Sequence, residues 1–404
     1  KLGEYAYDAG LAGLTYDIRI VPRGVRLTLG GYNDKLQTFA SYLSKKISTD
    51  MKDILPKDEA EFERYKDILT RTFAPTAFQF TNQELLDATE AATLGDLMEY
   101  VSSIWTSGKG VALVQGNVEE KEAQTLVTTI DKALGFQTIP ANEYPPELEP
   151  LPLPQSPANA MATRLSITEP NEENGNAASY VVIQSLSTEP KEHVLIELVS
   201  SIVSEPFYEE LRTRQQLGYI VSSGVKPVGK TKTMGFIVQS STAKNKKLTE
   251  EIIKYMDKIR TDLEKVKKGD FAVYVKSLID RKTEPEKTLA AETTRNWAEI
   301  ASGRFEFDRT QREVSALLSL EQEDLLEFWD HFYVKDGRRV LITEMIPQVG
   351  VASSPAPSKS TGYTPSSMSV AKSSGLVLGI DDIQRYRSER EKLLSTSVDL
   401  ERLA

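Results

Sequence analysis

The chain has 404 residues, of which 40% are hydrophobic, so it is long enough for two globular domains of ordinary size. It contains no cysteine, which excludes disulfides, thiolate metal sites and cysteine catalysis and favours a reducing compartment, for which we expect the cytoplasm. The net charge of −10 argues against general nucleic-acid binding, and no apolar run approaches the roughly 18 residues that a membrane-spanning helix needs.

The first 139 residues are predicted to form a partial domain of one hairpin, one buried strand and several helices. Alternating apolar residues on both sides of a Pro-Arg-Gly turn indicate the hairpin, and apolar residues three or four apart indicate the helices. The predicted ranges are a hairpin at 13–20 and 25–32, helices at 35–49, 58–73, 83–105 and 119–134, and a short buried strand at 111–115.

Residues 140–160 hold seven prolines, which remove backbone donors and resist helix, so this segment is predicted to be an extended linker. A second domain is predicted at 161–349. Its strands are expected at 162–168, 178–187, 219–225, 233–240 and 338–345, and its helices at 191–203, 248–263, 269–282, 286–302 and 321–333.

Local signals predict where a helix begins and ends in the middle of this second domain. Ser204 and Pro206 predict a helix restart, with the serine as N-cap and the proline in the first turn. Gly218 predicts the end of that helix in a left-handed conformation. After the domain, residues 350–404 are predicted to be a Ser/Pro-rich tail with a final amphipathic helix that includes Ile380 and Leu394.

The two halves of the chain resemble each other at a fixed offset. Three pairs of glycines lie 205 positions apart, namely Gly13 and Gly218, Gly24 and Gly229, and Gly30 and Gly235. Such self-similarity argues for duplicated domains, each predicted as an α+β unit with an antiparallel sheet and helices on one side. About 57 residues precede Gly218 in its copy but 12 precede Gly13, so copy one lacks its first elements and Lys1 is not expected to be the natural start.

Arg212 and Tyr219 are the candidate catalytic residues, because they occur in one copy only. At the same offset they correspond to Tyr7 and Leu14, whereas a requirement of the fold should recur in both copies. A guanidinium and a phenol seven residues apart, across a helix-to-strand turn, can both donate hydrogen bonds to a carbonyl oxygen or an oxyanion. The alternative is an arginine that binds helix-terminal carbonyls and a tyrosine on a half-buried strand.

The two histidines do not predict a metal site. His193 and Glu197 are four residues apart on one helix, but they supply two ligands without a third, which favours a surface helix pair. His331 lies among aromatic residues and is interpreted as structural. Neither a His-x-x-Glu-His nor a His-Glu-x-x-His motif occurs, so this sequence lacks a standard catalytic zinc site.

The segment 204–221 closely resembles the insulysin-like members of the M16, or pitrilysin, family of metallopeptidases. Its most specific part is Leu211-Arg-Thr-Arg-Gln-Gln-Leu-Gly-Tyr219. The resemblance covers nearly the whole chain and includes Glu4-Tyr-Ala-Tyr7, Leu11-Ala-Gly-Leu14, Gly31-Tyr-Asn-Asp-Lys35, Trp297-Ala-Glu-Ile300 and Phe305-Glu-Phe-Asp-Arg309.

This resemblance implies the third and fourth of four homologous domains, in a peptidase whose halves enclose peptide substrates. Zinc would be held by a missing N-terminal half and none by this chain. Arg212 and Tyr219 would bind the substrate and stabilise the oxyanion, and Tyr208 would line the substrate site. The resemblance also allows a homodimer.

A polyanion or nucleotide regulator is a further partner that the sequence suggests. Between Lys226 and Lys282 there are 15 basic residues against 7 acidic ones, which is typical of a solvated helical face or of a basic patch. The resemblance implies such a patch near Arg281, Lys282 and Lys287. Neither nucleic acid nor a membrane is expected as a partner.

The alternative to an enzyme half is a non-catalytic peptide-binding or scaffold subunit of the same family. The presence of both Arg212 and Tyr219 argues against it, because a scaffold needs neither side chain.

Overall fold

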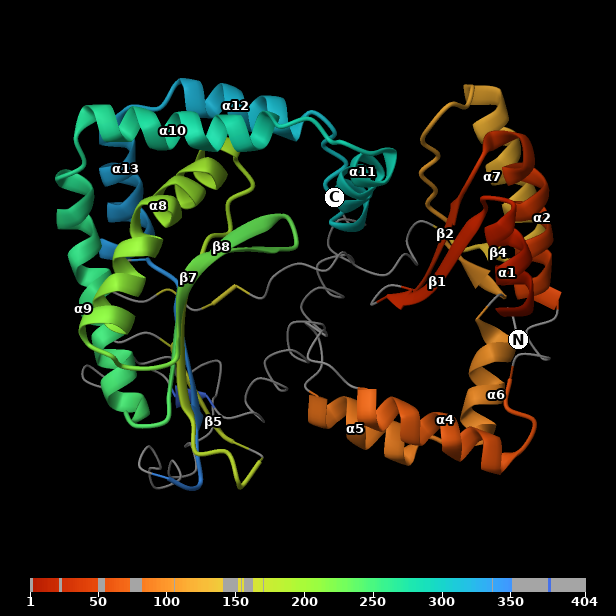
Figure 1. The fold of residues 1–404 in the computed structure, drawn as a ribbon, viewed down its shortest axis with the longest axis horizontal. Coiled ribbons are helices and arrows are strands. Elements are labelled where there is room, and N and C mark those ends of the chain that lie inside the picture. Colours follow the sequence, from red (N-terminus) through yellow and green to blue (C-terminus); the bar gives the residue numbers. More distant parts are fainter. Residues whose placement is uncertain are drawn as a thin grey trace, which may run out of the picture. The chain divides into compact units, whose positions relative to one another are not determined.

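The chain forms two compact units, Lys1–Glu147 and Leu148–Ala404. The computed structural model is shown in Figure 1. It describes residues 3–21, 24–49, 55–72, 82–104, 106–140, 152–153, 155, 163–169, 171–335, 337–350 and 377–378. The predicted Ser/Pro-rich segment 350–375 lies almost entirely outside the described residues, as do the final amphipathic helix and most of the linker.

Unit 1 contains the predicted hairpin and helices. The hairpin pairs β1 with β2 in antiparallel register from Thr15 opposite Gly30 to Val21 opposite Gly24. The other elements are mostly helical. They are α1 (Gly3–Leu11), β1 (Thr15–Val21), β2 (Gly24–Gly30), α2 (Asn33–Thr49), α4 (Glu59–Thr72), α5 (Asn82–Ala91), α6 (Leu94–Ser103), β3 (Ser107–Gly108), α7 (Glu120–Leu134) and β4 (Gln137–Thr138).

The small core of unit 1 lies along α2. Ala40, Leu43 and Ile47 follow helical spacing and are buried, while the ring of Phe39 lies 6.2 Å from that of Tyr16 on the hairpin. The hydroxyl of Ser48 donates to the Ala133 carbonyl at 2.6 Å, which joins α2 to the end of α7. Because these residues pack as their helical spacing indicates, the predicted helix at 35–49 agrees with α2.

The predicted buried strand at 111–115 is wrong. These residues have no regular structure, and Val111 is exposed. The two-residue strand β3 lies just before them and pairs in parallel with β4. A strand needs a neighbour that satisfies its backbone groups, and in the part of unit 1 that the structure describes no strand lies beside 111–115.

Unit 2 is built on a six-stranded sheet. The strand order is β10-β5-β9-β6-β8-β7, so β7 is an edge strand. The strands are β5 (Thr163–Thr168), β6 (Ala177–Gln184), β7 (Ile220–Val228), β8 (Thr231–Ser240), β9 (Val340–Ile346) and β10 (Val377–Leu378). The α+β prediction is confirmed. The sheet is mixed rather than wholly antiparallel, because β5 runs parallel to both β9 and β10.

Helices α8 (Pro190–Tyr208) and α9 (Asn245–Glu264) pack on one face of this sheet (Figure 1). The other helices of the unit are α10 (Lys268–Thr283), α11 (Leu289–Ala301), α12 (Arg309–Leu318) and α13 (Gln322–Trp329), with π-helices η2 (Glu209–Arg214) and η3 (Asp330–Val334). The core contains fully buried Val181, Phe236 and Trp329. Along β6 the burial alternates, as expected for a strand with one covered face.

One helix of unit 2, α12, was not predicted from the sequence. Helix α12 has Glu313 and Leu317 buried one turn apart, with Arg309 paired to Glu313. A buried carboxylate on the inner face weakens the apolar repeat that would have indicated the helix. The arginine and glutamate spaced four apart were the signal that could have found it.

Candidate functional site

The candidate site lies where α8 passes into η2 and then into β7. Helix α8 is continuous through Pro206, so the predicted restart at Ser204 is wrong. The Ser204 hydroxyl instead donates to the Ser200 carbonyl at 2.6 Å within the helix. Helix α8 has buried residues on most sides, and this packing outweighs the cost of an interior proline.

The turn into β7 is set by two residues with different conformations. Gln216 has a φ of 51°, so Gln216 takes the left-handed conformation. The prediction that Gly218 would take it is wrong. The amide of Leu217 donates to the Leu211 carbonyl at 3.0 Å, which closes the π-helical end. Gly218 serves another purpose, because a Cβ there would lie 1.9 Å from the Gln239 carbonyl oxygen on β8.

This turn brings Arg212 and Tyr219 together. The Arg212 guanidinium carbon lies 5.5 Å from the centre of the Tyr219 ring, within cation–π range. Tyr219 is 84% exposed, so its phenol is available to a ligand. Among the described residues no carboxylate pairs with Arg212, whereas its neighbour Arg214 contacts Glu209 and Glu210.

Tyr208 ends α8 and is 48% exposed, one turn before Arg212. The first unit differs at the corresponding positions, where Leu14 is buried and Tyr7 is an exposed helical residue. At these corresponding positions, therefore, only unit 2 has an arginine and a tyrosine. The geometry provides two hydrogen-bond donors on one surface, which suits a carbonyl oxygen or an oxyanion.

The three residues suggested for polyanion binding do not form one patch. Lys282 points into the unit, with its side chain 12% exposed and its ammonium 2.6 Å from Glu197 and 2.7 Å from Glu313. The expectation for Lys282 is therefore corrected, because two carboxylates already neutralise it. Arg281 is exposed at the end of α10, and Lys287 is exposed but pairs with Glu284 at 3.1 Å.

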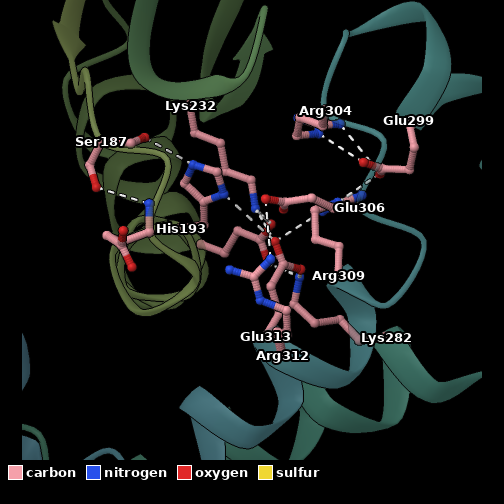
Figure 2. A network of polar contacts seen from close by, with 12 residues as sticks. Ser187, His193, Lys232, Lys282, Glu299, Arg304, Glu306, Arg309, Arg312 and Glu313 are labelled. Carbon is pink, nitrogen blue, oxygen red and sulfur yellow. Dashed lines mark hydrogen bonds and ion pairs between the residues drawn. The ribbon is translucent and has the colours of Figure 1, made fainter.

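Lys282 belongs to a buried ionic network that joins four helices to the sheet, drawn in Figure 2. Glu313, 2% exposed on α12, accepts from Lys232 of β8 at 3.1 Å and from Arg309 at 2.9 Å. Glu299 of α11 accepts from Arg309 at 2.7 Å and from Arg304 at 2.9 Å. Glu197 of α8 contacts Lys232 and Lys282. The network therefore locks α8, α10, α11 and α12 together.

The charges of this network shift its pKa values. Burial by itself would raise the pKa of Glu313, but the nearby His193 and the Lys232 and Lys282 charges lower it far below the usual range. The pKa of Glu197 is lowered by the same two lysines against its own burial. Both carboxylates are therefore ionised in the folded protein.

The two histidines lie in different surroundings. His193 is buried, not part of a surface pair as predicted; its Nε2 lies 3.1 Å from the Ser187 carbonyl and its Nδ1 lies 3.8 Å from Glu313. His331 is exposed in η3 beside the buried Phe332 and Tyr333. Within the described ranges, no group of three His, Cys, Asp or Glu side chains could hold a metal ion. These residues therefore do not fit zinc.

Comparisons with known proteins agree with this architecture. A model of the middle or third domain of peptidase M16 matches residues 1–96, and a model of the C-terminal lobe domain 4 of PqqF-like PQQ synthases matches residues 198–297. The solved structure of pitrilysin superposes with a TM-score of 0.71 at 19% identity, covering 88% of this chain and 38% of that one. The fold is thus that of M16 peptidase domains.

The relatives give the family. Insulin-degrading enzyme of Homo sapiens is 27% identical over 357 residues, which cover 84% of this chain and 34% of that protein. A protein of Schizosaccharomyces pombe named as a zinc protease is 25% identical over 81% of this chain and 35% of its own length. This chain belongs to the M16 family of pitrilysin and insulin-degrading enzyme and matches its middle and C-terminal domains.

The chain spans about a third of the length of the curated relatives that it matches. In the part that the structure describes, no helix is long and apolar enough to cross a bilayer.

Proposed function

We propose that this chain is the substrate-binding and catalysis-completing C-terminal half of a zinc metalloendopeptidase that degrades enclosed peptides. Zinc would be bound by a separate N-terminal half, because the described residues here do not fit it. The observation that carries the proposal is the Arg212 guanidinium, with which no described carboxylate pairs, beside the exposed Tyr219 phenol.

In this proposal both side chains act on the peptide carbonyl. Arg212 and Tyr219 donate hydrogen bonds to the carbonyl oxygen of the bond to be cleaved, and these bonds strengthen as negative charge develops there. Arg212 has no carboxylate partner among the described residues, so its charge is not already neutralised. The exposed ring of Tyr208 contributes apolar contact to the neighbouring substrate side chain.

The test is the turnover of a fluorogenic peptide by the full-length protein. Tyr219→Phe and Arg212→Ala are each expected to lower kcat by about 10- to 1000-fold, the scale of losing one oxyanion donor. Arg214→Ala is a matched control, because Arg214 is exposed and paired with acidic neighbours, and its kcat should stay within about twofold.

Two outcomes would contradict the proposal. Wild-type turnover in both Tyr219→Phe and Arg212→Ala would show that neither side chain contributes to catalysis. Peptide binding that survives loss of both side chains, in a protein that shows no zinc-dependent turnover, would instead support a scaffold subunit.

A further inference from the structure

The uncovered face of the unit 2 sheet carries a second set of donors. Val181, Phe236 and Val221 alternate toward the helices and are buried. Tyr180 and Lys226 lie at positions of the opposite parity on β6 and β7, facing away from the helices. They therefore lie on the face of the sheet opposite α8 and α9.

A glycine fixes the position of Tyr180. A Cβ at Gly235 would lie 2.3 Å from the Tyr180 hydroxyl oxygen and 2.6 Å from its ring carbon Cε2, so the ring lies flat on β8 where a side chain is absent. The Lys226 ammonium lies 5.3 Å from the centre of this ring. Gly224 is the cross-strand partner of Gly235, and a Cβ there would meet open space. At this register position, therefore, neither β7 nor β8 carries a side chain.

Neither donor of the pair has an acceptor. Across the described ranges, no carboxylate contacts the Lys226 ammonium, and no group accepts from the Tyr180 hydroxyl. By contrast, the inward-lying cations Lys232 and Arg164 are engaged, the first with Glu313 and the second with Glu344. Burial raises the pKa of Tyr180, so the phenol keeps its proton and remains a donor. An ammonium and a hydroxyl side by side suit a carboxylate.

We propose that Lys226 and Tyr180 form a carboxylate subsite for an acidic side chain, or the free C-terminus, of a bound extended peptide. This inference rests on the proposed function. Tyr219 immediately precedes β7, and Lys226 lies seven residues later on the same edge strand. At about 3.3 Å per residue, an extended peptide that follows β7 would place its carboxylate roughly seven residues from the bond held by Tyr219.

The test compares peptides that differ by one Glu→Gln change at each position from four to nine residues on either side of the cleavable bond. With the full-length protein, kcat/KM is expected to be about 3- to 10-fold higher for Glu at the best position, the scale of a partly exposed ionic contact. Lys226→Met should abolish the preference and Lys226→Arg should retain it, while Tyr180→Phe should weaken it.

Lys246→Met is the matched control, because Lys246 is an exposed lysine on α9 and its loss changes the net charge equally. It should leave the Glu preference intact. Equal rates for Glu and Gln at every position, or a preference that survives in Lys226→Met, would overturn the subsite.

A binding measurement separates this inference from the proposed function. Anisotropy of fluorescein-labelled Glu and Gln peptides, recorded with a zinc chelator present, should show the same 3- to 10-fold difference in Kd without cleavage. If the untreated wild-type protein cleaves no peptide, the proposed function fails while the Kd comparison still decides the subsite. Equal Kd values together with normal cleavage would contradict the subsite and leave the proposed function standing.

Discussion

At the scale of single residues, the candidate site depends on a close backbone approach. Gly218 lies against the Gln239 carbonyl, which leaves no room for a side chain, and the next residue is Tyr219. The left-handed Gln216 completes the turn. The placement of the phenol is therefore determined by its neighbours in the turn and on β8.

Gly218→Ala is expected to destabilise unit 2 by about 1–3 kcal/mol, because its methyl group would force β8 away from the turn. Urea unfolding of the purified protein checks this, and peptide turnover should fall as Tyr219 is displaced. Gly224→Ala is the matched control: its Cβ meets open space, so stability should be unchanged or slightly higher. Equal unfolding midpoints for the two variants would contradict the close-approach argument.

Tyr208→Ala is expected to raise KM by about 3- to 30-fold, because a half-exposed aromatic ring contributes apolar contact to the substrate. The kcat should change less than in Tyr219→Phe, since Tyr208 donates nothing to the reacting carbonyl in the proposed mechanism. Steady-state kinetics of the full-length protein distinguish the two, and a loss confined to kcat would be evidence against a binding role.

At the scale of elements, the buried ionic network holds the helices behind the site. Glu313 joins α12 to β8 and α10, and Glu197 joins α8 to the same two lysines. Helix α8 also carries the π-helix with Arg212 at its far end. The network is therefore a structural anchor for the element that presents the arginine.

Glu313→Gln should cost about 3–5 kcal/mol of unfolding free energy at pH 7, since it leaves buried lysine and arginine charges without their partner. Glu250→Gln is a matched control in an exposed pair and should cost less than about 0.5 kcal/mol. Chemical unfolding of all three proteins measures both values. A cost below 1 kcal/mol for Glu313→Gln would show that the network contributes little.

The same network predicts a pH dependence. The pKa of Glu313 is lowered in the folded protein, so its stabilisation is fully present above the unfolded value of about 4.3 and is lost as the pH falls below it. The stability gap between wild type and Glu313→Gln should therefore narrow between about pH 5 and pH 3. Urea midpoints across this range measure the gap, and a constant gap would be inconsistent with an ionised Glu313.

At the scale of the whole molecule, the chain supplies donors and packing but no metal site among its described residues. Under the proposed function, zinc removal by a chelator is expected to abolish peptide turnover by the full-length protein. It should shift the thermal midpoint of unit 2 by less than about 1 °C, because the described residues of that unit do not form a metal site. Calorimetry with and without chelator measures this. A large shift in unit 2 would mean that it binds zinc after all.

The sequence anticipated the elements whose burial follows a simple repeat. Helix α2 and the hairpin β1–β2 lie close to their predicted ranges, because one side of each is apolar at the expected spacing. The same reasoning failed for 111–115, which has apolar residues but no neighbouring strand, and for α12, whose inner face carries a carboxylate.

The candidate site was only partly accessible from the sequence. Comparison of the two copies singled out Arg212 and Tyr219, because a residue type that is absent from one copy is visible without coordinates. Their contact, the direction of Lys282, and the burial of His193 were not visible. Each depends on partners 7 to 120 positions away, such as Glu313 for His193.

The sequence by itself determined the α+β class, the self-similarity of the two halves and the absence of a zinc motif, because composition, spacing and motifs are properties of the linear chain. Only the tertiary structure decided which charges are buried together and which are left free. Lys282 and Lys226 are both lysines of one basic stretch. Lys282 is enclosed by two glutamates, whereas Lys226 lies over a tyrosine ring and no described carboxylate contacts it. That difference arises from long-range packing, which no local pattern specifies.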